Sequence, residues 1–323
     1  MPDRVIADHY NELHRCWKLL AYWAPDDSTN KTILSLPENM GIPINGQNSD
    51  EKYLLFEINY KNLHQIKSQF SDTTGFDLYL KQQNGDIDAD IVAIGSVPDY
   101  RFFVPPKLRH WMTTGNCYKD CIQNHLYDQS LNVLGIVHHS RHRLLKDLNV
   151  GVGNNHNNKQ MIKTLIKSSA GSSAPVDDNQ LTNGYNELNV NFENNDKLIV
   201  KCEFNSVNET HTVLGGISDD KVQCIAWLVY YPRIEDFNVC LSSFTLTTIM
   251  SITGIEQLEE SWSNGNDFDI TVMSSNNSTR LDDYLSNKID WDYKLINRSK
   301  YAAQYAKQSA QCSWNRSFLD LII

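Results

Sequence analysis

The sequence has no long apolar run, no excess of basic residues and no closely paired cysteines. None of its apolar runs approaches the ~18 residues of a membrane-spanning helix, so no transmembrane segment is predicted. The 29 basic and 39 acidic residues give a formal net charge of −10, which argues against a nucleic-acid partner because phosphate contacts need a basic face. The absence of a CxxC pair argues against a zinc ribbon or a thioredoxin-like redox site.

Seven cysteines are present all the same, an even set of six and one more, which suggests three disulfides and one orphan. N-glycosylation sequons begin at Asn30, Asn208, Asn276, Asn277, Asn297 and Asn315. Cysteines and sequons together favour a secreted or luminal glycoprotein. The first residues contain no apolar signal-peptide region, so we expect that the chain begins partway through a longer protein.

Helical periodicity is scarce, and one helix is predicted over residues 8–23. The other signals are short β runs bounded by turn residues, at 53–58, 76–80, 91–97, 131–137, 197–204 and 224–231. Many short strands joined by polar turns predict an all-β protein, with a β-sandwich or jelly-roll architecture.

Two segments show no clear strand pattern. Residues 151–184 are rich in Asn, Ser and Gly, which predicts a long surface loop that can hold a short helix at 159–167. The residues after about Gly254 predict a poorly patterned tail that wraps over the core and is partly disordered.

Eight ordered stretches carry a family resemblance. They are CWKLLAYWAP (16–25), LPENMGIPINGQ (36–47), YLLFEINYKN (53–62), TTGFDLYL (73–80), VPPKLRHWMTTGNCYKDC (104–121), GIVHHSRHRLLK (135–146), DKLIVKCEFN (196–205) and LGGISDDKVQCIAWLVYYP (214–232). In order and spacing they resemble the copper type II, ascorbate-dependent monooxygenases, and the dopamine β-hydroxylase-like branch is the closer match.

The resemblance implies two jelly-roll-like β-sandwich domains, of which the first is incomplete here, each contributing one copper to a wet cleft. Ascorbate reduces the coppers, and one of them binds O2 and hydroxylates a C–H bond of a small, amine-like substrate. The implied division is a partial N-terminal monooxygenase domain at 1–82, a C-terminal copper domain at 83–255 and an extension at 256–323.

The implied electron-transfer copper lacks its histidines. Its third histidine falls at Asn59, and nothing before Cys16 matches its His-His pair. Because an asparagine amide is a poor copper ligand beside imidazole, this site is predicted to be lost.

The implied O2-binding copper takes a His-x-His strand, in which the two histidines share one face. Here VHHSRHR places His139 and Arg141 at these positions in one register, and His138 and Ser140 in the other. Only a β-bulge would bring His142 to one ion with either of the two preceding histidines. The alternative interpretation of this stretch is a basic, solvated strand end.

Two further positions of the O2-binding site differ from the family pattern. The methionine that precedes the cysteine of CIAWLVYYP is Gln223, so the thioether that favours Cu(I) is missing. A tyrosine expected beside the substrate is Trp227, which the WLVYY run otherwise assigns to the sandwich core. About one of the six protein ligands survives by this carry-over.

The cysteines match the family better than the ligands do. The resemblance implies the disulfides Cys202–Cys224 and Cys117–Cys240, and Cys312 is the candidate partner of Cys121. Cys16 matches a cysteine whose partner would lie near or before the start of this chain.

Scaffold cysteines without metal ligands indicate a degenerate or truncated monooxygenase with little activity, a pseudoenzyme in the limit. The alternative is a catalytically dead, secreted binding or structural module of the same fold. A working enzyme with His138, His139 and His142 as unusual copper ligands is a further hypothesis. A last hypothesis is that the protein forms a homo-oligomer or pairs with an intact paralogue.

Overall fold

The fold is seen in a computed structural model. It describes residues 36–44, 86–118, 131–139, 144–156, 159–169, 196–216, 220–234, 237–262, 268–274, 277–306 and 308–312, and the single residues Leu20, Asp77, Leu80 and Cys121. Apart from those single residues, the helix predicted at 8–23 and the strands predicted at 53–58 and 76–80 lie outside this part of the chain, as does Asn59.

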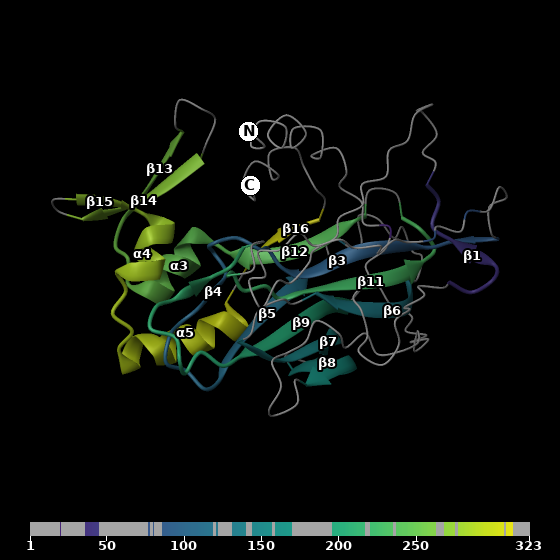
Figure 1. The fold of residues 1–323 in the computed structure, drawn as a ribbon, viewed down its shortest axis with the longest axis horizontal. Coiled ribbons are helices and arrows are strands. Elements are labelled where there is room, and N and C mark those ends of the chain that lie inside the picture. Colours follow the sequence, from purple (N-terminus) through teal and green to yellow (C-terminus); the bar gives the residue numbers. More distant parts are fainter. Residues whose placement is uncertain are drawn as a thin grey trace, which may run out of the picture.

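Two sheets face each other and form a β-sandwich, as the sequence predicts (Figure 1). One sheet has the order β16-β12-β3-β11-β6 and the other the order β5-β9-β7-β8. Their strands are β3 (Asp90–Ser96), β5 (Trp111–Cys117), β6 (Asn132–His139), β7 (Leu145–His156), β8 (Lys159–Ser169), β9 (Asp196–Phe204), β11 (Ile225–Tyr231), β12 (Val239–Phe244) and β16 (Gln308–Gln311). Neighbouring strands are antiparallel, except that β12 runs parallel to β3.

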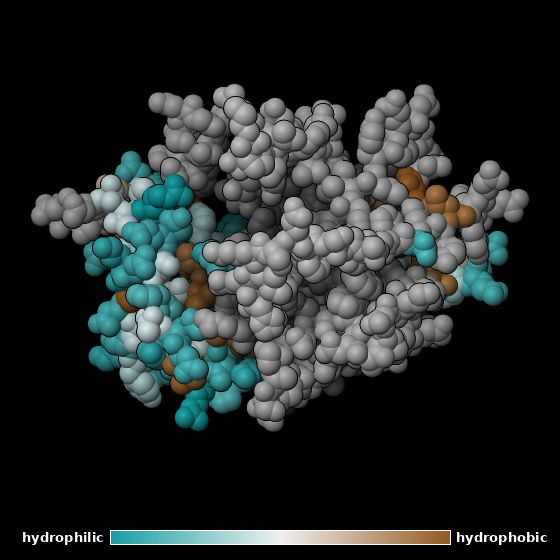
Figure 2. All heavy atoms as spheres, viewed as in Figure 1, coloured by the Kyte–Doolittle hydropathy of each residue, from teal (hydrophilic) through white to brown (hydrophobic). Residues whose placement is uncertain are grey.

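Smaller elements cover the edges and one end of the sandwich (Figure 1). They are the parallel pair β1 (Met40–Gly41) and β2 (Ile87–Asp88), the antiparallel pair β4 (Phe103–Val104) and β10 (Val213–Leu214), the meander β13 (Leu258–Trp262), β14 (Phe268–Ser274) and β15 (Asn277–Arg280), and the helices α3 (Leu246–Thr253), α4 (Leu281–Asn287) and α5 (Tyr293–Tyr305). The surface at the helical end is mainly hydrophilic (Figure 2). Among the described helices, none combines the length and apolarity that crossing a bilayer requires.

The alternation of β11 explains why the five-stranded sheet is buried on both faces. Cys224, Ala226, Leu228 and Tyr230 face the core between the two sheets. Ile225 and Val229 lie on the opposite face, which is also buried and against which Leu36, Met40 and Ile42 pack. A strand that is buried on both faces of its sheet has a continuous apolar sequence, as in CIAWLVYY.

The segment predicted as a loop with a short helix at 159–167 forms a hairpin of long strands instead. Residues 151–156 belong to β7, which pairs with β8 and β9, and 159–167 belong to β8. A glycine here is a strand residue that allows close packing, because a Cβ on Gly153 would stand 2.8 Å from Cδ1 of Ile199. Residues 170–184 lie outside the described chain.

The predicted tail after Gly254 is also ordered where the structure describes it, in β13 to β16 and the helices α4 and α5. Asp292 caps α5 by accepting a hydrogen bond from the Leu295 amide at 2.6 Å, and Leu295, Ser299 and Ala303 recur at i, i+4 and i+8 on its buried face. Strand β16 pairs with β12. The domain boundaries at 82 and 255 stay predictions.

The two sheets touch backbone to backbone at Gly95 of β3 and Gly115 of β5. A Cβ on Gly115 would stand 2.1 Å from the carbonyl carbon of Gly95, far inside any real contact. Gly95 has φ +133°, and a Cβ on it would stand 2.1 Å from the carbonyl oxygen of Cys224. Glycine is therefore required at both positions. We call this contact the glycine crossing.

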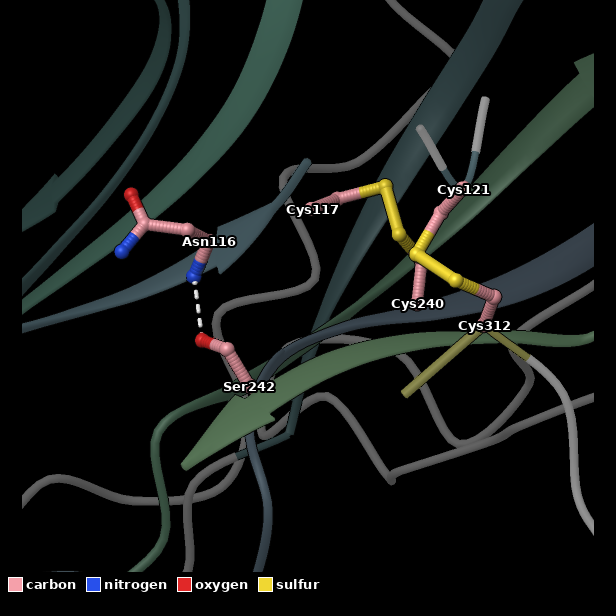
Figure 3. Close-up of a disulfide and its surroundings, with 6 residues drawn as sticks. All are labelled: Asn116, Cys117, Cys121, Cys240, Ser242 and Cys312. Carbon is pink, nitrogen blue, oxygen red and sulfur yellow. Dashed lines mark hydrogen bonds between the residues drawn. A yellow bond between two sulfur atoms is a disulfide. The ribbon is translucent and has the colours of Figure 1, made fainter. Parts of the chain in front are cut away.

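A buried polar network lies beside the glycine crossing, and Figure 3 shows its hydrogen bond between Asn116 and Ser242. The Asn116 amide donates to Oγ of Ser242 at 2.7 Å, and Nδ2 of Asn116 donates to Oε1 of Gln308 at 3.0 Å. Nε2 of Gln308 donates to the carbonyl oxygen of Thr114 at 2.7 Å. These bonds fasten β5 to β12 and β16, and each polar group that they bury has a partner.

Three disulfides link the sheets. They are the two pairings that the family resemblance implies, Cys117–Cys240 and Cys202–Cys224, and the candidate pairing of Cys121 with Cys312. Cys117–Cys240 joins β5 to β12, and Cys121–Cys312 joins the residues that follow β5 and β16 (Figure 3). Cys202–Cys224 joins β9 to the residue before β11 across 22 positions of sequence, and a loop of this size corresponds to about 3 kcal/mol in the chain-entropy account.

The glycine crossing gives a test of the fold. Gly115→Ala is expected to lower the free energy of unfolding by about 3 kcal/mol or more, because the backbone of Gly95 cannot yield to a new methyl group. Denaturant unfolding of the disulfide-intact protein measures this. The matched control is Gly41→Ala, where a Cβ meets nothing within 4 Å and the expected change is within about 0.5 kcal/mol. Equal effects of the two variants would contradict the crossing.

Candidate metal centre

The histidine stretch lies at the end of β6, next to β11. Ala226 pairs with His138 and Ile225 with His139, in a register that is unbroken from Gly135 onward. Adjacent positions of a regular strand belong to opposite faces of the sheet, so β6 separates these two positions rather than gathering them. Their side chains, and the whole of residues 140–143 with Ser140, Arg141 and His142, lie outside the described chain.

Gln223 is buried, with 4% of its surface exposed, at the position where the resemblance places the copper methionine. Its Nε2 donates to the carbonyl oxygen of Gly216 at 2.7 Å. The Val222 amide next to it donates to the carbonyl oxygen of Leu214 at 3.0 Å, and Val222 bridges Gly215. The Gln223 side chain therefore closes the connection between β10 and β11.

The remaining oxygen of Gln223, Oε1, is buried without a hydrogen-bond partner in the described part of the structure. An amide oxygen is a hard donor that suits magnesium or calcium, whereas Cu(I) prefers thioether and imidazole. The chemistry of this side chain therefore does not fit the copper that the family uses here.

Trp227 lies on the outer face of β11. It is half-buried and lies between two apolar clusters, one with Ala93 and Val239 and the other with Ile91 and Val229. Its Nε1 is buried and makes no hydrogen bond to a described residue. Trp227 therefore packs against apolar residues on the outer face of the sheet and not in the core between the two sheets.

The other donor groups that the structure describes are dispersed or already paired. No three side chains of His, Cys, Asp or Glu come together within the described ranges. Six of the cysteines are in disulfides. Among the histidines, Nδ1 of His110 lies 2.5 Å from Oε1 of Glu203 at the surface.

The buried carboxylates and phenols are also occupied. Asp99 accepts from Nε of Arg101 at 2.8 Å, and Oδ2 of Asp90 lies 3.4 Å from Nε of Arg233. Burial, with a contribution from Asp99, raises the pKa of Tyr100 to about 12. Burial likewise raises the pKa of Tyr230, whose hydroxyl donates to the carbonyl oxygen of Phe237 at 3.2 Å. Neither phenol is poised for proton transfer at neutral pH.

The polar network at the glycine crossing was not predicted from the sequence. Its members are polar residues in short strands that lie far apart in the sequence. Asn116 and Ser242 are separated by 126 positions, and Ser242 and Gln308 by 66. No local pattern joins them, and their burial becomes visible only when β5, β12 and β16 meet. The cysteine next to Asn116 and the one two positions before Ser242 are the signal that could have located this contact.

The structure is thus a disulfide-linked β-sandwich in which the buried Gln223 side chain is bonded to the backbone of Gly216. Residues 87–253 match the family model for the copper type II ascorbate-dependent monooxygenase, C-terminal domain. The chain belongs to this family, in its dopamine β-hydroxylase-like branch.

Several curated proteins are similar to this chain along most of its length. MOXD1 homolog 2 of Drosophila melanogaster is 25% identical over 75% of this chain and 31% of its own length. Tyramine beta-hydroxylase of Caenorhabditis briggsae is 21% identical over 86% of this chain and 47% of its own length. Dopamine beta-hydroxylase of Rattus norvegicus is 23% identical over 75% of this chain and 35% of its own length. The chain thus spans less than half the length of these relatives.

Replacing Gln223 tests its structural role. Gln223→Ala is expected to speed hydrogen exchange at the Val222 amide about fivefold, because loss of one hydrogen bond of about 1 kcal/mol loosens the connection between β10 and β11. Hydrogen-exchange mass spectrometry of the segment from Gly215 to Val222 measures this. The exposed Gln257→Ala is the control and should leave that segment unchanged. Unchanged hydrogen exchange at the Val222 amide in Gln223→Ala would show that the Gln223 side chain does not stabilise this connection.

Proposed function

We propose that this protein keeps the scaffold of a copper monooxygenase while having lost most of the copper ligands, and that it has little or no C–H hydroxylase activity. The observation that carries the proposal is the Gln223 side chain, which is buried and donates to the carbonyl oxygen of Gly216. A residue committed to a backbone carbonyl replaces the soft donor that Cu(I) needs.

The sequence supports the same conclusion at the other ligand positions. Asn59 stands where the resemblance implies a histidine of the electron-transfer copper, and Arg141 or Ser140 stands in the His-x-His strand. A redox-active copper depends on its full ligand set and on the groups that orient it, so one or two surviving imidazoles do not define its geometry or potential.

The alternative is a binding or structural module that is secreted and catalytically dead. Three disulfides support a secretory or extracellular location, because such bonds persist in oxidising compartments. Relatives named for dopamine and tyramine support an amine-like molecule as the ligand or residual substrate, with ascorbate as reductant if any turnover remains. Such a module would act by forming a homo-oligomer or by pairing with an intact paralogue.

Copper content and turnover test the proposal. The purified, disulfide-intact protein, loaded with copper and then dialysed, is expected to hold only background metal by mass spectrometry. It should not hydroxylate dopamine or tyramine in the presence of ascorbate and O2. The comparison is the triple variant His138→Ala, His139→Ala, His142→Ala, which should retain the same background copper. Copper bound in a one-to-one ratio by the natural chain and lost from this variant would contradict the proposal, in favour of an enzyme with unusual ligands.

A variant that restores one copper ligand tests whether the other copper ligands are present. Gln223→Met supplies the missing thioether, yet it is expected to add no tightly held copper, because a single soft donor does not define a site. Stability should change by about 1 kcal/mol, since the bond to Gly216 is lost while a buried, unpaired oxygen is removed. Stoichiometric copper in Gln223→Met would show that the remaining ligand set is intact.

A further inference from the structure

We propose that Asn208 is the acceptor of an N-linked glycan. The proposal rests on the secretory-pathway location proposed above, and it goes further by choosing one sequon from the several in the sequence. The choice depends on two sequons whose asparagine and hydroxyl side chains are both described, Asn208-Glu-Thr210 and Asn297-Arg-Ser299. A third sequon begins at Asn277, the first residue of β15, but the Asn277 side chain lies outside the described part of the structure.

Asn208 lies at the tip of a tight turn that follows β9. The turn is closed by the Glu209 amide, which donates to the carbonyl oxygen of Ser206 at 3.0 Å, and by the Val207 amide, which donates to Oδ1 of Asn205 at 3.1 Å. Asn208 and Thr210 are both exposed. A sequon in an exposed turn presents its amide and its hydroxyl to solvent together.

Buried hydrogen bonds fix the turn at both of its ends. Ser206 is fully buried, donates through Oγ to the carbonyl oxygen of Pro105 and accepts from the Leu108 amide at 3.2 Å. Thr212, at the other end, accepts from Nε1 of Trp291 at 2.8 Å. The anchoring groups point into the protein and the sequon points out, so a bulky, solvated glycan on Asn208 displaces no packed side chain.

The modification is a glycosyl transfer from a lipid pyrophosphate-linked oligosaccharide. Nδ2 of Asn208 forms a bond to the anomeric carbon of the first sugar and loses one proton. The bond between that carbon and the pyrophosphate oxygen breaks, and the lipid pyrophosphate leaves with the electron pair. No oxidant or reductant takes part, and the transferring enzyme must reach the asparagine amide and the sequon hydroxyl together.

The second described sequon is placed differently. Asn297 is exposed, but it lies in the middle of α5, and Ser299 is fully buried and donates through Oγ to the carbonyl oxygen of Ile252 at 3.4 Å. In the folded chain the hydroxyl that defines this sequon is unavailable. Asn297 is therefore the matched control, a sequon with an exposed asparagine and an inaccessible hydroxyl.

Expression of the full chain behind an added cleavable signal peptide, in a eukaryotic secretory cell, tests the site. Peptide-N-glycosidase in heavy-oxygen water converts a glycosylated asparagine into labelled aspartate, which peptide mass spectrometry locates. We expect label at residue 208. We expect Asn208→Gln and Thr210→Ala each to remove one glycan-sized step in gel mobility, while Thr210→Ser keeps it and Asn297→Gln changes nothing.

An unlabelled residue 208 in the secreted protein would overturn the inference, as would a mobility step that survives both Asn208→Gln and Thr210→Ala. Thr210 is exposed, so its two variants test the sequon without disturbing the turn. Since the added signal peptide delivers the chain to the glycosylating compartment, failure at Asn208 leaves the proposed loss of copper untouched. Copper binding would overturn that proposal and leave the glycan standing.

Discussion

The glycine crossing is the contact on which the rest of the sandwich depends. Gly95 and Gly115 let the backbones of β3 and β5 touch, and no other residue fits at either position. This approach brings Cys117 within bonding distance of Cys240 and lets the Asn116 amide reach Ser242 (Figure 3). The spacing of the two sheets is thereby fixed by backbone, disulfide and buried hydrogen bonds together.

These contacts are made by backbone packing, disulfides and hydrogen bonds, which under the proposed function gives a physical reason why the scaffold is kept without the chemistry. The Cys202–Cys224 disulfide holds the end of β11 directly beside Gln223, whose amide closes the connection to β10. If the proposed function is right, the substitution at residue 223 costs little stability, because it exchanges a metal-binding group for a hydrogen bond. Family membership accordingly describes the fold and its cysteines more firmly than it describes activity.

The strands at 91–97, 131–137, 197–204 and 224–231 could be predicted from the sequence, because burial leaves continuous apolar runs in them. The strand β8 could not, because it lies in a segment rich in Asn, Ser and Gly that predicts a loop with a short helix at 159–167. Its pairing with β7 depends on tertiary context. The helix α5 shows only three buried positions in thirteen residues. At the candidate centre, family resemblance located Gln223, but its bond to Gly216 required the structure.

Thermal unfolding in the presence of Cu(I) shows whether this fold is stable without copper. A ligand that binds only the native state raises stability by about 2.7 kcal/mol at a hundred times its dissociation constant, so a copper-binding protein must unfold at a higher temperature as copper is added. With the disulfides intact and Cu(I) kept reduced by ascorbate under anaerobic conditions, we expect the same unfolding midpoint at every copper concentration. A midpoint that rises steadily with copper would contradict it.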